Sequence, residues 1–231
     1  MPRGQLSTLG KKIERFVGRW VGRQRFDDFL FQIPGLVHVG AHTGQERARY
    51  ALHGLKVLWV EPIAEMFEEL SANIAPYPEQ RAIRELLTDR DGVEYDFSIS
   101  SNKGASSSIL PLAQHREMWP TVDYVEQRRL RGITLGTLFK REGISTRDYQ
   151  ALVLDVQGAE LMVLNGAGDL VREFRFVQAE AADFEIYKGG AQLKDLQEYL
   201  RRAGFVELRR RQFNHQPAIG TCWDVVWERR E

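Results

Sequence analysis

Cysteine is almost absent from this chain, which has a single one, Cys222, among its 231 residues. One cysteine cannot form an internal disulfide, and it cannot supply a zinc site that needs several cysteine ligands. Long apolar runs are absent as well, since no stretch approaches the roughly 20 residues that a membrane-spanning helix needs. The first residues contain no uninterrupted apolar core followed by a cleavage signal, so we expect no secretory peptide. The sequence therefore predicts a cytoplasmic protein without a transmembrane segment.

An excess of one charge is also missing. Lys plus Arg and Asp plus Glu number 32 each, which leaves a formal net charge of zero at pH 7. This balance provides no global basic surface, so we expect no nucleic-acid partner. The charge is uneven along the chain, however, because segment 3–25 is rich in Lys and Arg and has Glu14 as its acidic residue.

The amino-terminal segment has the spacing of an amphipathic helix. Apolar residues recur at i, i+3, i+4, i+7 and i+8, and they are Ile13, Phe16, Val17, Trp20 and Val21. We predict a helical extension over residues 1–33, ahead of a main domain over 34–231. Its apolar face indicates packing on that domain or on a second copy, as a homodimer, whereas its basic face leaves a membrane-surface helix as the alternative.

Strand and helix patterns alternate from residue 34 to the end of the chain. Apolar or alternating runs typical of strands occupy 35–39, 56–60, 82–87, 93–100, 151–156, 174–181, 205–213 and 222–230. Helical spacing is found over 63–74, 134–144 and 192–203. Such alternation predicts an α/β protein with a doubly wound, mostly parallel, Rossmann-like sheet. The last two strands have no helix between them, so we expect an antiparallel strand near one edge.

Two glycines follow the first strand, in the stretch VHVGAHTGQE over 37–46. In such sheets ligands bind at the carboxyl ends of the strands. Glycine lets the backbone turn tightly and approach a ligand closely, and the next helix directs its N–H groups to the same place. The alternative is a turn glycine with a helix cap. The candidate cofactor-binding residues of this loop are Gly40, Ala41, His42, Thr43 and Gly44.

The second strand candidate ends in an acid, Glu61, followed by Pro62. An acid at this place can accept both hydroxyls of a ribose, although a surface acid at a strand end is the simpler alternative. Together the two signals indicate a nucleoside-containing cofactor. The dinucleotide pattern G-x-G-x-x-G is not met by the loop after the first strand, which favours S-adenosylmethionine over NAD.

A third stretch, LVLDVQGAELMVLNGA over 152–167, resembles the central motif of the FkbM family of S-adenosylmethionine-dependent methyltransferases. Gln157 stands where the family usually has an acid, and the matching positions are Asp155, Gly158, Ala159 and Glu160. The glycine loop and the segment from Glu61 look like the family's cofactor loop and ribose acid. The resemblance runs from about Gly35 to the carboxyl terminus, with its motifs in the family's order.

This resemblance implies a methyltransferase fold and S-adenosyl-L-methionine as cofactor. It also implies methyl transfer, most often to a hydroxyl of a small molecule, sugar or secondary metabolite, so the expected partner is a small-molecule or glycan acceptor. The alternatives are an N-methyltransferase, an NAD-dependent oxidoreductase, and an inactive module that only binds the cofactor. The last is left open by His38 and Gln157, which depart from the usual pattern.

Three residues are candidates for catalysis. Asp155, at the carboxyl end of a central strand, is best placed to orient the substrate or the methionine end of the cofactor, and Glu180 is next. His42 can reach the same crevice, or it can shape the loop. A divalent metal held by Asp155 and Glu180 is a further option that Gln157 disfavours. Glu160 is expected at a helix N-terminus, where a carboxylate is stabilising.

Other residues are candidates for binding the cofactor. His38 replaces an acid that many methyltransferases use at the methionine end, and Glu46 can supply that charge, although His38 also fits a hydrogen-bonded core histidine. Gln157 is a further candidate beside Asp155. Ser107, with Ser106 and Ser108, either lines the pocket or forms a solvated loop. Segment 102–131 has no pattern that identifies the acceptor; Trp119, Tyr124 and Tyr187 can stack on a sugar ring or fill a lid.

Overall fold

The computed structural model describes residues 26–230 of the chain. It divides the chain into two units, 1–32 and 33–231. In the described part of the first unit, η1 (Asp27–Gln32) is a short 3-10 helix. The amphipathic helix predicted around Ile13, Phe16, Trp20 and Val21 lies outside the described residues, so its packing stays a prediction.

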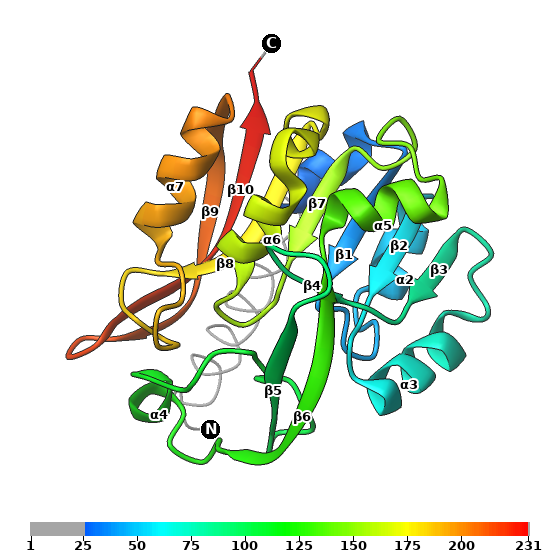
Figure 1. Cartoon of the computed structure of the whole chain (residues 1–231). Helices are drawn as coiled ribbons and strands as arrows, with labels where there is room; N and C mark the ends of the chain where they lie inside the picture. Colours follow the sequence, from blue (N-terminus) through cyan, green and yellow to red (C-terminus); the bar gives the residue numbers. More distant parts are fainter. Residues whose placement is uncertain (1–25, 231) are drawn as a thin grey trace, which may run out of the picture. The chain divides into compact units, whose positions relative to one another are not determined.

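A seven-stranded sheet forms the centre of the second unit (Figure 1). Its strands are, in sheet order, β3 (Gln80–Ile83), β2 (Lys56–Val60), β1 (Gly35–Val39), β7 (Ala151–Leu154), β8 (Phe176–Ala182), β10 (Gly220–Arg229) and β9 (Phe205–Gln216). Neighbours run parallel except for β10, which is antiparallel to both β8 and β9. The predicted doubly wound, mostly parallel sheet with an antiparallel strand near one edge is therefore confirmed.

Strand order reverses between β1 and β7, which pair in parallel with Val39 opposite Leu154. The chain leaves β1 toward β2 and β3 on one side and returns through β7 toward β8 on the other. At such a switch point the loops that follow the two strands diverge, which leaves a crevice at their carboxyl ends. The loops after β1 and β7 carry the glycine stretch and Asp155, so the topology brings these two motifs together.

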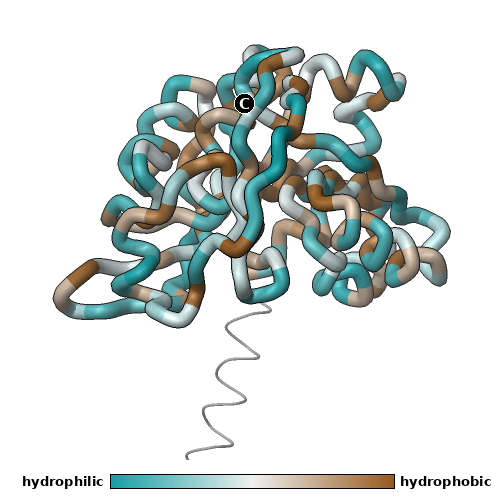
Figure 2. The backbone as a smooth tube through the Cα atoms, turned by 60° about the horizontal axis from the view of Figure 1, so that its bottom comes forward, coloured by the Kyte–Doolittle hydropathy of each residue, from teal (hydrophilic) through white to brown (hydrophobic). Residues whose placement is uncertain are grey.

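Helices cover both faces of the sheet because its central strands are apolar on both sides. The helices are α2 (Arg47–Leu52), α3 (Ala64–Ile74), α4 (His115–Met118), α5 (Leu135–Glu142), α6 (Glu160–Ala167) and α7 (Leu193–Arg202), with a 3-10 helix, η2 (Gly168–Glu173). Figure 1 shows α5, α6 and α7 over one face, where their apolar residues join Val37 and Val39 in one core. Alternation along β1 turns His38 to the opposite face, toward Tyr50 of α2. Figure 2 shows hydrophobic stretches alternating with hydrophilic ones along the backbone, both in the middle of the fold and at its edge.

A second, three-stranded sheet lies at the carboxyl ends of the central strands (Figure 1). Its order is β4-β6-β5, with bounds β4 (Leu86–Leu87), β6 (Tyr124–Ile133) and β5 (Glu94–Ser100). The stretch 82–87, predicted as one strand, is divided between β3 and β4. The sequence did not predict β6, because half of its residues are exposed and a run of polar side chains replaces apolar alternation in its centre.

Candidate active site

A cavity with about 850 Å³ of empty space opens at the carboxyl ends of β1, β2 and β7; we refer to it as the first cavity. Residues of the second sheet, including Leu87 and Phe97, form its outer wall. The candidate residues that line it are His38, Gly40, Ala41, His42, Glu46, Glu61, Pro62, Ser107, Asp155 and Gln157. Thr43 and Gly44 are candidates that lie outside this lining. Residues far apart in the sequence thus meet around one space.

The two loop glycines are required by the packing of the protein on itself. Gly40 has φ +79°, and a Cβ added there would overlap the backbone carbonyl oxygen of Asp155. A Cβ on Gly44 would lie 2.7 Å from Leu70 Cδ1 of α3. The sequence predicts room for a ligand at these glycines, whereas the structure places the loop after β7 and helix α3 in that space. Gly40 therefore brings Asp155 close to the cofactor loop.

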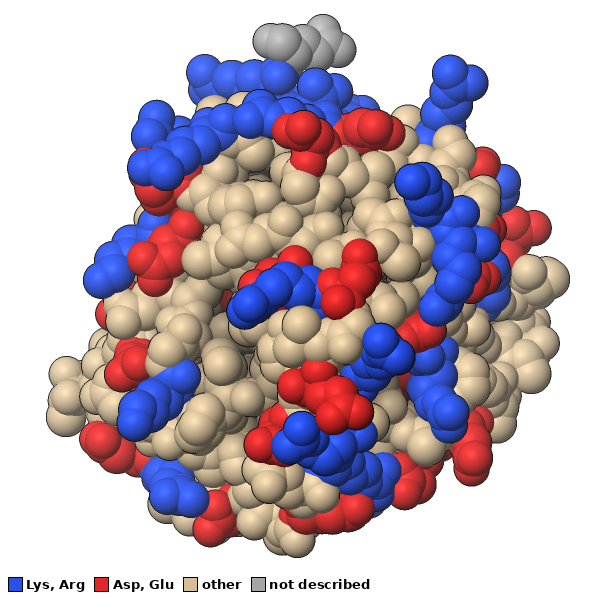
Figure 3. Space-filling model, in the orientation of Figure 1, with Lys and Arg blue, Asp and Glu red and all other residues tan. Residues whose placement is uncertain are grey.

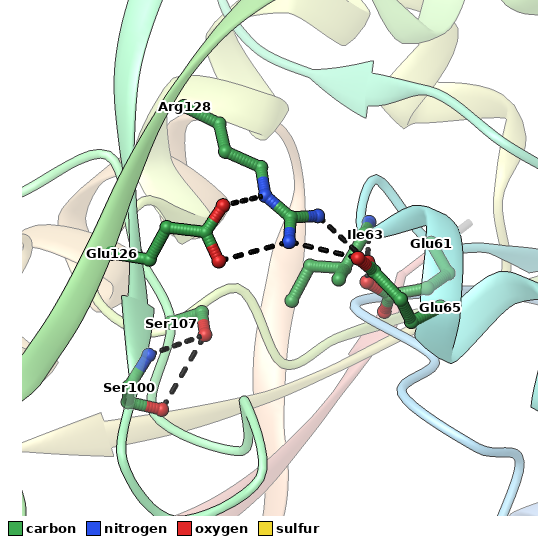
Figure 4. Close-up of polar contacts among 7 residues, drawn as sticks. All are labelled: Glu61, Ile63, Glu65, Ser100, Ser107, Glu126 and Arg128. Atoms are coloured by element: carbon green, nitrogen blue, oxygen red, sulfur yellow. Dashed lines mark hydrogen bonds and ion pairs between the residues drawn. The ribbon is translucent and has the colours of Figure 1, made fainter.

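Glu61 joins the loops that follow β1 and β2. One carboxylate oxygen accepts a hydrogen bond from the backbone N–H of His42 at 2.7 Å, and the other accepts from the N–H of Ile63 at 2.9 Å (Figure 4). The side chain is buried, and this burial raises its pKa to about 7. Each oxygen keeps a further lone pair, so the carboxylate is oriented and can still accept hydrogen bonds from a ligand.

His42 connects the cofactor loop to loop 101–109. Its Nε2 lies 2.8 Å from the carbonyl oxygen of Lys103, and its Nδ1 lies 3.4 Å from Nε2 of Gln45. A carbonyl oxygen accepts only, so Nε2 carries the hydrogen and Nδ1 accepts from Gln45. Both ring nitrogens are engaged by the protein. This geometry favours the loop-shaping role for His42 over the proton-transfer role that the sequence also allows.

His38 is a neutral, hydrogen-bonded histidine at the base of the first cavity. Its Nδ1 lies 3.2 Å from the hydroxyl of Tyr50, and its ring stacks on Trp59 with centroids 4.9 Å apart. Burial lowers the pKa of His38 to about 4, so the ring is uncharged at neutral pH. His38 thus has the contacts of a hydrogen-bonded core histidine. Glu46 lines the same cavity.

Asp155 follows β7 directly and is held by two neighbouring polar side chains. Gln157 Nε2 donates a hydrogen bond to Asp155 Oδ1 at 2.5 Å, and the Tyr187 hydroxyl donates to Gln157 Oε1 at 2.6 Å. Gln157 adopts φ +52°, a conformation that few residues other than glycine take. Burial raises the pKa of Asp155 to about 6, so the carboxylate is ionised above that pH.

The three serines of loop 101–109 bond to the protein and shape this loop. Ser107 Oγ accepts from the backbone N–H of Ser100 at 3.0 Å (Figure 4). Ser108 Oγ donates to the carbonyl oxygen of Gln157 at 2.7 Å, and Ser106 Oγ accepts from the Asn102 amide at 3.0 Å. Ser107 lines the first cavity. The loop is therefore an ordered wall of the site.

A second cavity, with about 890 Å³ of empty space, adjoins the first and shares Ala105, Asp155 and Gln157 with it. Glu180 of β8 lines this second cavity and does not line the first. Burial, together with the nearby Asp155 and Asp224 carboxylates, raises the pKa of Glu180 well above its usual value. The two leading catalytic candidates thus open to the same space, and only Asp155 also reaches the first cavity.

The second cavity includes residues for which the sequence provided no functional role. His115 of α4 and Phe213 of β9 line it, together with Trp119 and Tyr187. Helix α4 has only four residues, too few for a periodic pattern, and the available signal was a histidine close to Trp119. Tyr124, the third aromatic considered, donates instead to the Leu110 carbonyl oxygen at 2.6 Å. Glu160 begins α6 as expected, and its carboxylate accepts from the backbone N–H groups of Val156 and Gly158.

Within residues 26–230, no group of three or more His, Cys, Asp or Glu side chains is arranged to hold a metal ion. None of the helices within the same range has the length and apolar character needed to cross a membrane.

Comparison with known proteins identifies the family through one family model and finds a similar fold among solved structures. The model of the methyltransferase FkbM domain matches residues 38–207. The 2-O-methyltransferase NoeI of Sinorhizobium fredii (strain NBRC 101917 / NGR234) is 26% identical over 180 residues, which cover 72% of this chain and 71% of NoeI. Among solved structures, the METTL16 methyltransferase domain is 14% identical with a TM-score of 0.50, covering 92% of this chain and 68% of that one. Magnesium protoporphyrin IX methyltransferase from Synechocystis PCC 6803, solved with bound S-adenosylmethionine, is 12% identical with a TM-score of 0.47, covering 100% and 86%.

Proposed function

The chain belongs to the FkbM methyltransferase family, and we propose that it methylates a hydroxyl group of a small-molecule or glycan acceptor. It is an S-adenosylmethionine-dependent methyltransferase by family. The oxygen acceptor is the proposed part. It is supported by the name of the relative NoeI, a 2-O-methyltransferase, and by the Asp155 carboxylate, which lines both cavities.

One observation carries the proposal: Asp155 lines both cavities. Methyl transfer needs the donor and the nucleophile in contact and in line, which two adjoining cavities with a shared wall provide. We assign the first cavity to the cofactor and the second to the acceptor. The transferred methyl group then passes close to Asp155.

The residues of the first cavity fit S-adenosylmethionine. Glu61 offers the ribose hydroxyls a carboxylate that two backbone N–H groups already orient. Ile63, Leu87 and Phe97 provide an apolar surface suited to a flat base. Glu46, on the side of the cavity near His38, suits the ammonium group of the methionine end. When bound, the cofactor supplies an electrophilic methyl group on a sulfonium sulfur.

Asp155 is the residue that we assign to the acceptor hydroxyl. With a pKa of about 6 it is mostly a carboxylate at neutral pH, so it can accept a hydrogen bond from the hydroxyl and take up its proton. Gln157 and Tyr187 keep Asp155 in one orientation through their chain of hydrogen bonds. Glu180 opens to the same cavity and is the second candidate for this role.

Calorimetry of the full chain with S-adenosylmethionine, at pH 8 where Glu61 is ionised, tests the cofactor site. Glu61→Gln should weaken binding by roughly 10- to 100-fold, because the ribose hydroxyls lose a charged acceptor worth about 1.5–3 kcal/mol. Glu69→Gln, an exposed change on α3, is the matched control and should bind normally. Equal affinity of the two variants would contradict the placement of the ribose.

Measurements of methyl transfer distinguish an O-methyltransferase from an N-methyltransferase and from an inactive binding module. Methyl transfer from labelled cofactor to hydroxyl acceptors supports the proposal, and transfer to amines alone would support the N-methyltransferase instead. Tight cofactor binding without transfer to either class would favour the inactive binding module.

A further inference from the structure

The polar wall of the second cavity is made of carboxylates. Asp155, Glu160 and Glu180 line it, and among its lining residues in the described chain none is Lys or Arg. Burial raises the pKa of Asp155 to about 6, that of Glu160 to about 7 and that of Glu180 well above its usual value, so Asp155 carries most of the negative charge of this wall at neutral pH. An anionic group in this cavity would meet the Asp155 carboxylate and would find no Lys or Arg in the lining to pair with. The cavity therefore disfavours phosphate and carboxylate groups on a ligand.

The opposite wall is aromatic. The ring of His115 packs against Trp119 and Tyr187, with centroids 4.7 and 5.4 Å apart. Phe213 of β9 lines the same cavity and keeps 44% of its surface exposed. Flat aromatic surfaces of this kind bind the apolar face of a ring and leave the hydroxyls at its edge free for hydrogen bonds.

His115 adds an uncharged polar group whose hydrogen bonding is incomplete. The side chain is only 2% exposed, and its buried Nδ1 has no hydrogen-bond partner in the protein. Burial lowers the pKa of His115 to about 4, so the imidazole is neutral. Buried polar groups without partners are uncommon, and one beside a cavity is typical of a ligand site. A neutral imidazole adds no positive charge that would attract an anion.

The carboxylates also distinguish a hydroxyl from an amine. Attack on the methyl group needs a free lone pair on the nucleophile, which a protonated amine lacks. The Asp155 carboxylate stabilises the protonated form of an amine beside it and would hold the amine unreactive. A hydroxyl is uncharged before the reaction and donates its hydrogen bond to the same carboxylate without this penalty.

We infer that the second cavity binds the methyl acceptor as an uncharged ring carrying hydroxyl groups, such as a glycoside, with the ring on Trp119 and one hydroxyl at Asp155. This inference rests on the proposed function. The acceptor oxygen forms a bond to the methyl carbon while the bond from that carbon to sulfur breaks. The sulfur keeps the electron pair, and the hydroxyl proton passes to the Asp155 carboxylate.

A panel of acceptors of matched shape tests the inference on the unsubstituted full chain. Methyl glycosides with free hydroxyls are compared with two anionic counterparts, using labelled cofactor. These are the methyl glycosides of the corresponding uronic acids, whose carboxyl group is ionised, and the phosphorylated methyl glycosides. We expect transfer to the neutral glycosides and a kcat/KM at least 100-fold lower for their anionic counterparts. Equal rates for anionic and neutral members would overturn the inference, and this comparison needs no variant to fold.

Two substitutions examine the walls separately. Trp119→Leu should raise KM for the glycoside by 10-fold or more and change the affinity for cofactor little. Glu180→Lys, which places a cation in the lining, should narrow the discrimination against anions by 10-fold or more, while Glu117→Lys, on the exposed side of α4 and outside the cavity, should leave it unchanged. Unchanged discrimination in Glu180→Lys would contradict the exclusion of anions by the charge of this wall.

Cofactor calorimetry on the same preparation separates the two levels of the proposal. If the cofactor binds and no glycoside is methylated, the acceptor class inferred here is wrong, while the family's methyl-transfer activity stands. If the cofactor does not bind, the proposed function fails and the inference fails with it.

Discussion

Asp155 is the side chain on which the proposed chemistry depends most. Asp155→Asn keeps the oxygen that accepts from Gln157 and removes the charge, so the fold should be retained. We expect methyl transfer to fall by roughly 10²–10⁴-fold, as is typical for a group that accepts a proton in the reaction. The rate of the unsubstituted enzyme should also fall as the pH drops through about 6, where Asp155 becomes protonated.

The measurement is turnover with labelled cofactor beside a melting curve. Asp148→Asn, an exposed change just before the other end of β7, is the matched control and should keep full activity. Full turnover in Asp155→Asn would exclude this residue from the mechanism. Lost turnover together with a collapsed melting temperature would make it structural, and Glu180 would become the leading candidate.

Gln157 tunes the same carboxylate, because its amide donates a hydrogen bond to Asp155. Gln157→Glu would replace a donor by a second carboxylate, so the pKa of Asp155 should rise. We expect the acid limb of the pH–rate profile to move upward by roughly one unit. Gln150→Glu adds the same charge ahead of β7 and should leave the profile in place. An unshifted profile in Gln157→Glu would mean that another group controls the rate.

An exposed cluster of charged side chains connects the second sheet to helix α3. Arg128 of β6 donates to Glu65 of α3 at 2.7 and 2.8 Å and to Glu126 at 2.6 and 3.0 Å (Figure 4). These bonds hold the pKa of Glu65 at about 2. The two glutamates are exposed to solvent, which screens their charges, so we expect the cluster to contribute little to stability. We expect the cluster to act mainly by holding the second sheet, which forms the outer wall of the first cavity, in place over a bound cofactor.

Arg128→Gln should therefore lower the melting temperature by no more than about 2–4 °C and speed cofactor dissociation a few-fold. Arg129→Gln is the control, since Arg129 pairs with Glu94 and Asp96 within the same sheet. Stopped-flow displacement of bound cofactor measures the rate. Equal dissociation rates in the two variants would show that the Arg128 cluster does not hold the outer wall.

Charged side chains of both signs lie on the surface, whereas those of the candidate active site are carboxyl groups. Figure 3 shows Lys and Arg side chains interspersed with Asp and Glu on one face. Arg201 and Arg202 of α7, for example, both pair with Glu198. The buried carboxyls dominate the dependence of stability on pH above 6.5. Burial raises the pKa values of Glu61 and Glu160 to about 7 from the ordinary 4.5, so the folded state binds protons that the unfolded state has released.

The free energy of unfolding should accordingly decrease as the pH rises through 7. His38 and His115, with pKa values lowered to about 4, have the opposite effect, but only below about 6.5. Between pH 6.5 and 8 we expect a loss of under about 1 kcal/mol per carboxyl, or a few degrees in melting temperature. Glu61→Gln should flatten this decline, whereas a steeper or unchanged decline would contradict the pKa assigned to Glu61.

The amino-terminal segment supplies a prediction that rests on the sequence alone. The apolar face formed by Ile13, Phe16, Trp20 and Val21 should pack on the main domain or on a second copy. Removing residues 1–25 should lower the melting temperature or change the mass measured by light scattering. If neither changes, the membrane-surface alternative becomes the better interpretation, and binding to anionic vesicles would test it.

Local pattern was enough to predict the fold and the position of the first cavity. Apolar strands followed by Gly40, Glu61 and Asp155 indicate a parallel sheet, and the carboxyl ends of parallel strands meet at one edge, so these residues had to converge. The family motif around Asp155 then identified the cofactor chemistry. Each of these signals is contained in a short run of sequence, and none depends on knowing which loops contact each other.

Contacts between segments that are distant in the sequence determine the features that local pattern does not predict. Gly40 is needed because the Asp155 backbone occupies its Cβ position, and His42 is tied to Lys103, 61 residues away. The acceptor wall combines His115 from a helix of one turn with Phe213 from a distant strand. No periodicity marks such residues, because each is placed by the packing of its own loop or strand. The charge and the shape of the second cavity therefore depend on the folded chain. Folding brings carboxyl groups from β8 and from the loop after β7 together with aromatic rings from α4 and β9.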